Sequence, residues 1–430
     1  MMQTFKYPPR NRWENLAVRP GSGNKAIEKT VRDILTQVKK RGDNALIEIT
    51  EELDGIRLSS LKIDARAIGE AGNKISPALK KAIGKAYKNI YTFHTSQFSG
   101  KVKKTETAKG VLCWRKPVAV EKVGLYIPGG SAPLFSTVLM LGIPAQIAGC
   151  KEVILCSPPP VHPAILYAAG LCGIKNIFNI GGAQAIGAMA YGTATIAAAD
   201  KIFGPGNAYV TAAKQLVNCE GTGIDIDMPA GPSEVLIIAD DSSNPAFIAA
   251  DLLSQAEHGT DSQVILLSDS TELINRTMLE VNIQLEYLPR KKLASEALKK
   301  SRALLFKSLN EAMAFSNLYA PEHLILCCKN AAEMAGKVIN AGSVFIGNYS
   351  PESAGDYASG TNHTLPTSGF ARTLSGISVE SFIKYISFQK ISRTGLEELA
   401  ETIETMAEAE QLTGHKNAVT IRLKKKRKQL

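Results

Sequence analysis

From about residue 118 the chain alternates short runs of β-branched and other apolar residues with alanine-rich stretches. Four apolar runs lie in "VEKVGLYIPGG", "KEVILC", "IKNIFNIGG" and "DKIFGPG". Each is followed by a stretch with helical spacing of its apolar positions, namely "APLFSTVLMLGIPAQIAG", "HPAILYAAGLCG", "AQAIGAMAYGTATIAAA" and "NAYVTAAKQLVN". Strands that feed helices through glycine-containing turns predict a parallel sheet with helices on both faces.

A second series of the same kind follows "IDMPAGPSE". It runs from strand "EVLIIAD" through helix "PAFIAADLLSQAEHG", strand "SQVILLSDS" and one long helix to the strands in "RALLFKS" and "SVFIG". We therefore predict an α/β protein with two tandem Rossmann-like, incompletely doubly wound parallel-sheet domains. The segments 26–53 and 77–97 are predicted to be peripheral helices, and an amphipathic helix over 396–412 is predicted in an extended C-terminal segment.

The expected organisation has four parts. An N-terminal segment is expected over residues 1–20. A larger α/β domain with a helical N-terminal part, on the substrate and zinc side, is expected to combine residues 21–125 with 232–377. A nucleotide-binding-like α/β domain is expected over 126–231, and a dimerisation segment over 378–430. The last segment has so little core of its own that we expect it to pack against a partner.

Composition favours an ordinary globular protein of the cytoplasm. Hydrophobic residues make up 45% and aromatic residues 6% of the chain. The longest apolar stretch, "STVLMLGIPAQIAG", is too short and too interrupted to span a bilayer, and the start has no apolar core of a signal peptide. The seven cysteines form no CxxC pair, which indicates a reduced compartment and packing roles.

The net charge of +10 owes six positive residues to the tail "IRLKKKRKQL". A basic tail can bind nucleic acid or anionic lipid. No aromatic residues interleave with these basic ones as a nucleic-acid platform requires, so we interpret the tail as a solvated end. We expect neither a nucleic-acid partner nor a membrane.

Three strand–helix turns are rich in glycine, in "LYIPGGSAP", "IGGAQAIG" and "FGPGNAY", but none matches the dinucleotide fingerprint GxGxxG. Such glycines either let a phosphate approach a helix N-terminus or simply make tight turns. Tyr126, Gln184 and Asn207 lie at the carboxyl ends of the predicted strands, where ligands bind in such sheets. The position of these three residues favours a nucleotide-binding site at this edge of the sheet.

Histidine is scarce, and four of the six histidines lie in polar motifs late in the chain. These four motifs pair Gln255 with His258, Glu322 with His323, Asp356 with His363, and Glu410 with His415. Imidazole, carboxylate and, less often, amide groups are donors that zinc accepts. Each histidine alone could be a surface residue, but together they favour a shared site. His94 and His162 lack such surroundings and are interpreted as structural.

The stretch "SQAEHGTD" offers two pairings for His258. Neighbours on a helix point about 100° apart, so Glu257 and His258 do not share a ligand easily. Gln255 lies three residues before His258 and would share its face, which suits a metal. The other Glu-His dipeptide, Glu322-His323, lies outside a helix.

With these residues in view, the sequence resembles the histidinol dehydrogenase family over nearly its whole length. The family's motifs occur in order as "GLYIPGG", "GGAQAIGAMAYGT", "KIFGPGNAYV", "DMPAGPSEV", "DLLSQAEHG", "APEHL", "AGDYASGTNHTLPT" and "LTGHKNAV". The resemblance implies a zinc-dependent, NAD-linked oxidation of L-histidinol through the aldehyde to L-histidine, the last step of histidine biosynthesis.

The resemblance also implies a role for each matching residue. The family's zinc ligands match Gln255, His258, Asp356 and His415, and all four also contact the substrate. Its acid–base pair matches Glu322 and His323, and further substrate contacts match Ser233, Glu410 and again His323. Its NAD contacts match Tyr126, Gln184 and Asn207.

The same resemblance implies a homodimer whose C-terminal segment crosses to the neighbouring subunit. Glu410 and His415 would then complete the partner's site. Two other classes stay open from the residues alone: a zinc hydrolase in which Glu322 activates water, and a non-catalytic protein that binds RNA or lipid through its basic tail.

Overall fold

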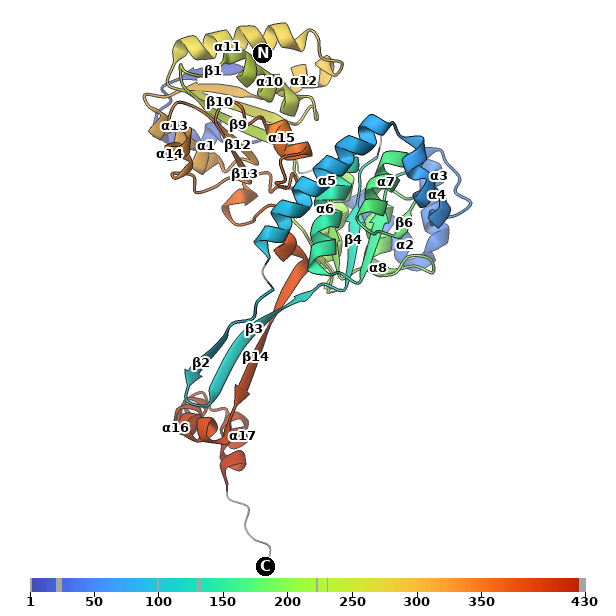
Figure 1. Cartoon of the computed structure of the whole chain (residues 1–430), viewed down its shortest axis with the longest axis vertical. Coiled ribbons are helices and arrows are strands. Elements are labelled where there is room, and N and C mark those ends of the chain that lie inside the picture. Colours follow the sequence, from blue (N-terminus) through green and yellow to red (C-terminus); the bar gives the residue numbers. More distant parts are fainter. Residues whose placement is uncertain are drawn as a thin grey trace, which may run out of the picture. The chain divides into compact units, whose positions relative to one another are not determined.

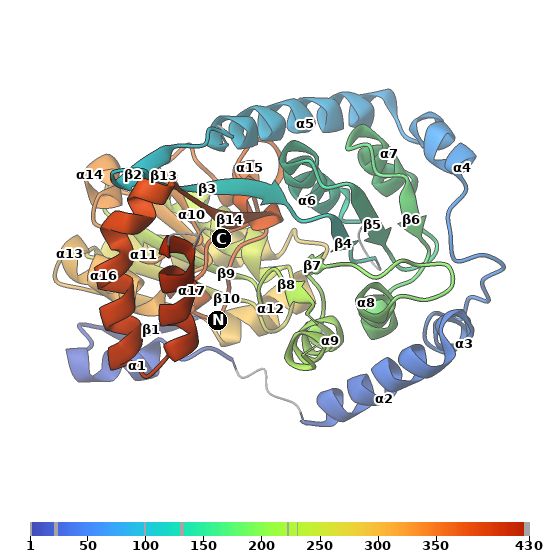
Figure 2. The same cartoon turned by 90° about the horizontal axis from the view of Figure 1, so that it is seen from below.

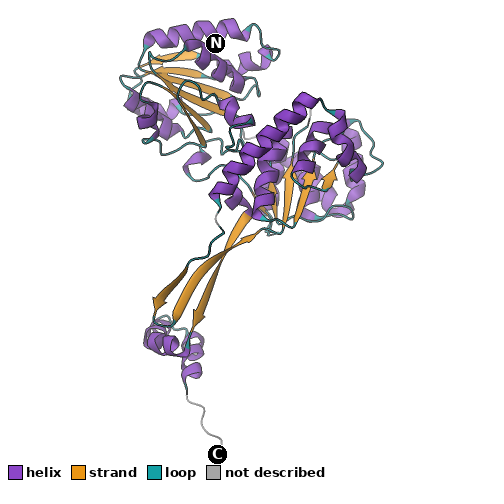
Figure 3. Ribbon diagram, in the orientation of Figure 1, coloured by secondary structure: helices purple, strands orange, loops and turns teal. Residues whose placement is uncertain are grey.

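The computed structural model describes residues 2–20, 25–98, 100–129, 133–221, 223–229 and 231–424. The chain forms two compact units (Figures 1 and 3). The first comprises Met1–Gln97 with Val120–Phe382, and the second comprises Phe98–Ala119 with Ile383–Leu430. Part of the first glycine turn, residues 130–132, and residues 425–430 of the basic tail lie outside the described residues.

The first sheet of the larger unit has five parallel strands in the order β6-β5-β4-β7-β8. They are β4 (Lys122–Tyr126), β5 (Glu152–Cys156), β6 (Asn176–Phe178), β7 (Lys201–Phe203) and β8 (Asp225–Ile226). The connecting helices are α6 (Phe135–Ala148), α7 (Pro163–Leu171), α8 (Gly182–Tyr191) and α9 (Ala208–Cys219). The predicted helix over 183–199 is shorter than expected because Gly192, with φ of 73°, ends α8.

The second sheet of this unit is also parallel, with the order β1-β11-β10-β9-β12-β13. Its strands are β1 (Gln3–Lys6), β9 (Glu234–Ala239), β10 (Gln263–Ser268), β11 (Arg302–Leu305), β12 (His323–Cys327) and β13 (Ser343–Ile346). Its helices are α10 (Pro245–Ala256), α11 (Thr271–Leu285), α12 (Lys291–Lys299), α13 (Leu309–Tyr319), α14 (Ala331–Ala335) and α15 (Glu352–Tyr357).

Without β1, the second sheet repeats the strand order of the first, which confirms the prediction of two tandem Rossmann-like sheets. One long helix was predicted after β10, but the structure has two, α11 and α12. Pro289 lies between them, and the residue before a proline avoids the helical conformation.

The N-terminal helices pack on the first sheet. They are α2 (Lys25–Arg41), α3 (Asp43–Asp54), α4 (Ala65–Glu70) and α5 (Pro77–Gln97). Leu35 and Val38 of α2 share a hydrophobic core with Ile186 of α8, and Ile90 of α5 shares one with Leu139 of α6. Figure 2 shows α5 alongside α6. The expected grouping of 21–125 with 232–377 therefore does not follow the packing.

The first twenty residues belong to the second sheet instead. Strand β1 pairs with β11, and Trp13 and Leu16 of α1 (Trp13–Leu16) join the core that contains Phe306 and Phe315. Short 3₁₀ helices complete the secondary structure of this unit: η1 (Arg10–Arg12), η2 (Ala71–Lys74), η3 (Phe370–Arg372) and η4 (Val379–Phe382). No described helix is long and apolar enough to cross a bilayer.

The smaller unit contains a three-stranded antiparallel sheet that the sequence did not predict. Its order is β14-β3-β2, with β2 (Lys104–Ala108), β3 (Val111–Ala119) and β14 (Ile383–Ile391). The helical C-terminal segment is present as α16 (Arg393–Ala409) and α17 (Thr413–Leu423). Of the residues in these fully described strands, Val111 alone is buried, so no hydrophobic period marked them.

A buried ion pair supports the turn after β7. Lys214 of α9 pairs with Asp227, and both side chains are at most 2% exposed. The Lys214 ammonium group also donates to the Gly204 carbonyl oxygen (2.9 Å), and the Asp227 carboxylate accepts from the Gly204 N–H (2.8 Å). The pair therefore positions the turn that leads to Asn207.

We predict that Lys214→Met lowers the free energy of unfolding by about 3–5 kcal/mol, because it leaves the Asp227 carboxylate buried without a counter-charge. Urea denaturation followed by circular dichroism measures this loss. Lys201→Met is the matched control. Its partner Asp225 is 61% exposed, so the control should lose no more than about 1 kcal/mol. Equal losses in the two variants would contradict the assignment.

Candidate active site

Three candidate side chains contact the backbone N–H and carbonyl oxygen of Glu234. Glu234 is the first residue of β9, and its backbone N–H donates to Glu322 Oε2 (2.8 Å). Its carbonyl oxygen faces Gln255 Nε2 at 3.2 Å and His323 Nδ1 at 3.0 Å. Side chains from the end of α10 and the start of β12 are thereby held against one backbone unit of a central strand.

These hydrogen bonds determine which atoms of His323 and Gln255 remain available. A carbonyl oxygen only accepts, so Gln255 Nε2 donates to Glu234, and His323 Nδ1, which also lies 3.0 Å from Gln255 Nε2, donates to Glu234 in the tautomer that carries its proton on Nδ1. Neutral His323 then carries its lone pair on Nε2, which lies 3.8 Å from Asp356 Oδ1. Gln255 keeps its amide oxygen for another partner, such as a cation. The sequence pattern predicted the residues but not this tautomer.

A partly buried ion pair holds the start of β9. The Arg19 guanidinium donates two hydrogen bonds to the Glu234 carboxylate. It also donates to the carbonyl oxygens of Tyr319 (2.8 Å) and Ala320 (3.2 Å). Ala320 has φ of 55°, an unfavourable value for a residue with a side chain. Arg19 therefore stabilises the turn that leads into the Glu322-His323 dipeptide.

His258, Glu352 and Asp356 offer donor atoms that all lie within 4.8 Å of one another. Among the described His, Cys, Asp and Glu side chains, this is the one group of three that is close enough to hold an ion. Glu352 and Asp356 are four residues apart on α15 and share its face. His258 lies in the turn two residues after α10, not within the helix as the spacing suggested.

The acidic surroundings shift the pKa of two groups in this cluster. Burial lowers the pKa of His323, but the carboxylates of Glu322, Glu352 and Asp356 raise it to about 10. Burial and the neighbouring carboxylates raise the pKa of Glu352 to about 8. A divalent cation bound by the same carboxylates would offset their charge and favour neutral His323. The cluster has the charge that a cation site needs.

His363 connects this cluster to the first sheet's helical layer. Its Nδ1 donates to the Asp356 carbonyl oxygen (2.9 Å), so Nε2 accepts from Thr137 Oγ1 of α6 (3.2 Å). Burial lowers the pKa of His363, which favours the neutral form that both bonds require. The sequence marked the motif around His363, but Thr137 lies 226 residues away along the chain.

The three candidate nucleotide contacts lie at the carboxyl edge of the first sheet. Tyr126 ends β4, and its hydroxyl accepts a hydrogen bond from the Gly182 N–H at the start of α8 (3.1 Å). Gln184 lies in the first turn of α8, and its Oε1 is buried without a hydrogen-bond partner. Asn207 caps α9 through its amide oxygen alone, which accepts from Tyr209 and Val210.

The glycine turn after β7 brings these elements together. Gly204 has φ of 126°, and a Cβ atom there would lie 2.1 Å from the Tyr126 carbonyl oxygen. The residue must be glycine for the ends of β4 and β7 to approach each other. Strand order reverses between these two strands, and this is where nucleotides bind in doubly wound sheets.

The three remaining predicted residues lie in two places. Ser233 directly precedes Glu234 at the amino edge of the second sheet, and its carbonyl oxygen accepts from the Gln263 N–H (3.1 Å). Glu410 and His415 belong to the smaller unit, where Glu410 caps the end of α16 and His415 lies in the first turn of α17. Both are exposed in the chain.

Comparison with known proteins gives one consistent result. The family model described as histidinol dehydrogenase matches residues 17–423. The histidinol dehydrogenase of Bacteroides thetaiotaomicron is 54% identical and covers 98% of this chain and 99% of its own. That of Escherichia coli strain K12 is 54% identical over 95% of this chain and 94% of its own. The chain belongs to the histidinol dehydrogenase family.

A solved structure supports the same conclusion for the fold. The crystal structure of histidinol dehydrogenase from Elizabethkingia anophelis has a TM-score of 0.95 and 54% sequence identity, and the match covers 98% of each chain. The chain is therefore an oxidoreductase of the histidinol dehydrogenase family, as the eight motifs indicated. Family membership decides against both a hydrolase and a non-catalytic binding protein.

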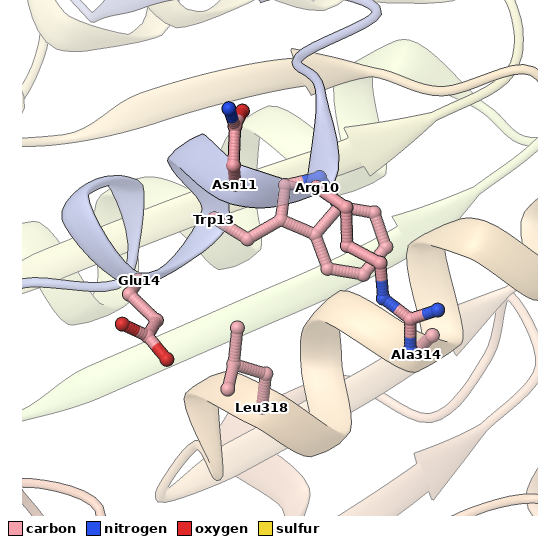
Figure 4. Close-up of a pocket in the computed structure, with 6 residues that line it drawn as sticks. All are labelled: Arg10, Asn11, Trp13, Glu14, Ala314 and Leu318. Atoms are coloured by element: carbon pink, nitrogen blue, oxygen red, sulfur yellow. The ribbon is translucent and has the colours of Figure 1, made fainter.

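The hollow drawn in Figure 4 is not part of the candidate site. It is lined by Arg10, Asn11, Trp13, Glu14, Ala314 and Leu318. The Trp13 indole donates to the Pro8 carbonyl oxygen (3.0 Å), so the hollow lies where the N-terminal segment packs on α13. None of the candidate site residues lines it.

Three residues that shape the site were not predicted from the sequence. Glu352 lies four residues before Asp356 in "ESAGDY", and this helical spacing was an available signal. Arg19 and Thr137 gave no signal, because each meets its partner across more than two hundred residues of chain.

His94 is a further buried histidine, and it lies against Asn362, the chain neighbour of His363. His94 donates from Nδ1 to Gln97 Oε1 (3.1 Å), and its Nε2 faces the Asn362 amide nitrogen at 3.5 Å. The same amide donates to the Met140 carbonyl oxygen. Burial lowers the pKa of His94, so the folded protein keeps this imidazole neutral. The structural role predicted for His94 is consistent with these contacts.

We predict that His94 makes stability pH-dependent. Its folded-state pKa lies below the ordinary value of 6.5, so below pH 6.5 the unfolded chain binds the extra proton. Its contribution is complete above pH 6.5 and is lost as the pH falls toward the folded-state pKa. Melting temperatures of the wild type and His94→Gln between pH 7.5 and 5 test this. An equally steep decline in both proteins would rule it out.

Proposed function

We propose that this chain is a zinc-dependent histidinol dehydrogenase. It oxidises L-histidinol through L-histidinal to L-histidine in a four-electron reaction that reduces two NAD molecules, at the last step of histidine biosynthesis. The observation that carries the proposal is the agreement of family membership with one donor cluster. Gln255, Glu322 and His323 lie beside that cluster of His258, Glu352 and Asp356, since His323 lies near Gln255, Glu322 and Asp356.

The donor set suits zinc. His258 offers an imidazole nitrogen, Asp356 a carboxylate and Gln255 an amide oxygen, all of which zinc accepts. His415 of the neighbouring subunit is proposed as the fourth ligand. When bound, the ion would hold the amine and imidazole of the substrate and so fix the carbon that is oxidised.

The first sheet supplies the proposed NAD site. Tyr126, Gln184 and Asn207 lie at the carboxyl edge beside the point where strand order reverses. Gln184 Oε1, buried and unpartnered, is an acceptor that a ligand N–H or hydroxyl group would satisfy. NAD would supply the hydride acceptor.

The acid–base pair is arranged for proton transfer. His323 donates from Nδ1 to the Glu234 carbonyl oxygen, so its Nε2 can take the hydroxyl proton of histidinol as the first hydride leaves. The resulting aldehyde must then add water before a second hydride can leave. Glu322, held by the Glu234 N–H, is the base proposed for that water.

The dimer proposal rests on the C-terminal segment. Glu410 and His415 are exposed in the smaller unit, although the family roles require both at a substrate site. Exchange of this segment between two chains would bring Glu410 to the partner's substrate and His415 to its zinc. Each site would then consist of residues from two subunits.

We predict that the protein reduces NAD when L-histidinol is supplied, and that chelation abolishes this while added zinc restores it. His323→Asn should lower kcat by about a hundred-fold or more, because it removes the proton acceptor at Nε2. Absorbance of NADH measures the rate. Failure of the zinc-loaded wild type to form NADH would refute the dehydrogenase proposal for this chain.

We also predict that two inactive variants complement each other. His415→Asn should lack one proposed zinc ligand, and with it activity, in the site that it completes, and His323→Asn should lack the base. A heterodimer of the two contains one site that carries neither change. Tagged heterodimers, purified and assayed for NADH formation, should therefore recover up to half of the wild-type rate per dimer. Verified heterodimers without activity would contradict the exchanged segment.

A further inference from the structure

Glu352 is a buried carboxylate of the site that the proposed reaction does not use. Its side chain is 1% exposed, and its Oε2 atom is buried without a hydrogen-bond partner. An unpartnered polar atom in the interior costs free energy, so its retention calls for a partner that binds there. His258, Asp356 and Glu352 each offer one possible metal-ligand atom, and these three atoms lie within 4.8 Å of one another.

The backbone holds Glu352 in this place. Its N–H donates to the Asp251 carboxylate of α10, one helical turn before Gln255. The same hydrogen bond joins the start of α15 to α10. It therefore connects the helix that carries Glu352 and Asp356 to the helix that carries Gln255. Gly355 strengthens the arrangement, since a Cβ atom there would lie 2.7 Å from the Phe345 ring. Glu352 and Asp356 are consequently fixed on one face of α15.

Charge gives an independent reason for a second carboxylate. The four proposed zinc ligands contain one negative group, Asp356, alongside an amide and two imidazoles. A divalent cation in a largely buried site is better neutralised by two carboxylates than by one. Glu352 is the carboxylate within reach of both His258 and Asp356.

We propose that Glu352 is a further metal-binding residue, which together with Gln255, His258 and Asp356 completes a four-donor site within the larger unit. The inference rests on the proposed zinc dependence and extends it. It implies that a subunit holds its ion through its own residues, before His415 of a partner takes part. The ion would then be retained, more weakly, when His415 is replaced.

The test is zinc affinity of the full-length protein, measured by competition with a chromophoric chelator. Glu352→Gln keeps the shape and removes the charge, and should weaken zinc binding by about 10- to 100-fold. Glu257→Gln is the matched control, since this half-buried carboxylate adjoins His258 in the chain but lies outside the donor group. It should change the affinity less than about three-fold.

The remaining variants separate a ligand from a structural residue. His415→Asn should still bind one zinc ion per chain, and Glu352→Gln/His415→Asn should lose it. Cobalt(II) added to the metal-free proteins should give different d–d absorption bands in Glu352→Gln and in wild type, which a structural carboxylate would not cause. The metal-free Glu352→Gln protein should melt no lower than wild type, because it loses an unpartnered buried acid.

Two results would overturn the inference. One is wild-type zinc affinity together with unchanged cobalt bands in Glu352→Gln. The other is complete loss of zinc from His415→Asn alone. Glu352→Ala removes the donor oxygen as well as the charge, and must bind zinc at least as weakly as Glu352→Gln. A wild type that binds no zinc would instead refute the zinc dependence itself, and the chelator titration of the wild type distinguishes that case.

Discussion

The site depends on one requirement. The backbone N–H and carbonyl oxygen of Glu234, at the start of a central buried strand, must both have hydrogen-bond partners. Its N–H is bound by Glu322, and its carbonyl oxygen accepts from Gln255 and His323. The side chain of Glu234 is in turn neutralised by Arg19. Buried backbone groups must find partners, and here the partners are the candidate acid–base and metal side chains. The same hydrogen bonds that satisfy the start of the strand therefore also orient the side chains of Gln255, Glu322 and His323.

The two sheets share a strand order but present their candidate residues at opposite edges. Tyr126 ends a strand of the first sheet, whereas Glu234 and His323 begin strands of the second. Helices between parallel strands run antiparallel to them, so the C-terminal end of α10 returns to the amino edge of its sheet. This geometry carries Gln255 and His258 to the start of β9 and β12. The first sheet presents its candidate residues at the edge where nucleotides bind in doubly wound sheets, whereas the second sheet presents its candidate residues at the opposite edge.

Contacts between segments that are distant in the chain hold the larger unit's functional parts in register. His363 joins the backbone of Asp356 to Thr137 of α6, and Asn362 joins the same loop to Met140. The imidazole of His363 therefore links α6, which packs on the first sheet, to Asp356, a proposed metal ligand. The buried pair of Lys214 and Asp227 has the corresponding role at the turn before Asn207. In both cases a buried polar side chain has a hydrogen-bond or ion-pair partner on one helix or loop, and it positions a second helix or loop through another hydrogen bond.

The sequence by itself determined the α/β class, the two strand series and the motifs, because apolar periodicity and turn chemistry are local properties. The family resemblance in those motifs also identified the acid–base dipeptide and the metal residues as candidates. Tertiary structure decided the rest. The sheet of β2, β3 and β14 buries too little to leave a periodic signal, and the N-terminal helices joined the first sheet through side-chain packing that no local pattern encodes. The approach of Glu352 to His258, and of Arg19 to Glu234, depends on where separate elements meet in space. Such encounters arise from the packing of whole layers, so only the folded chain reveals them.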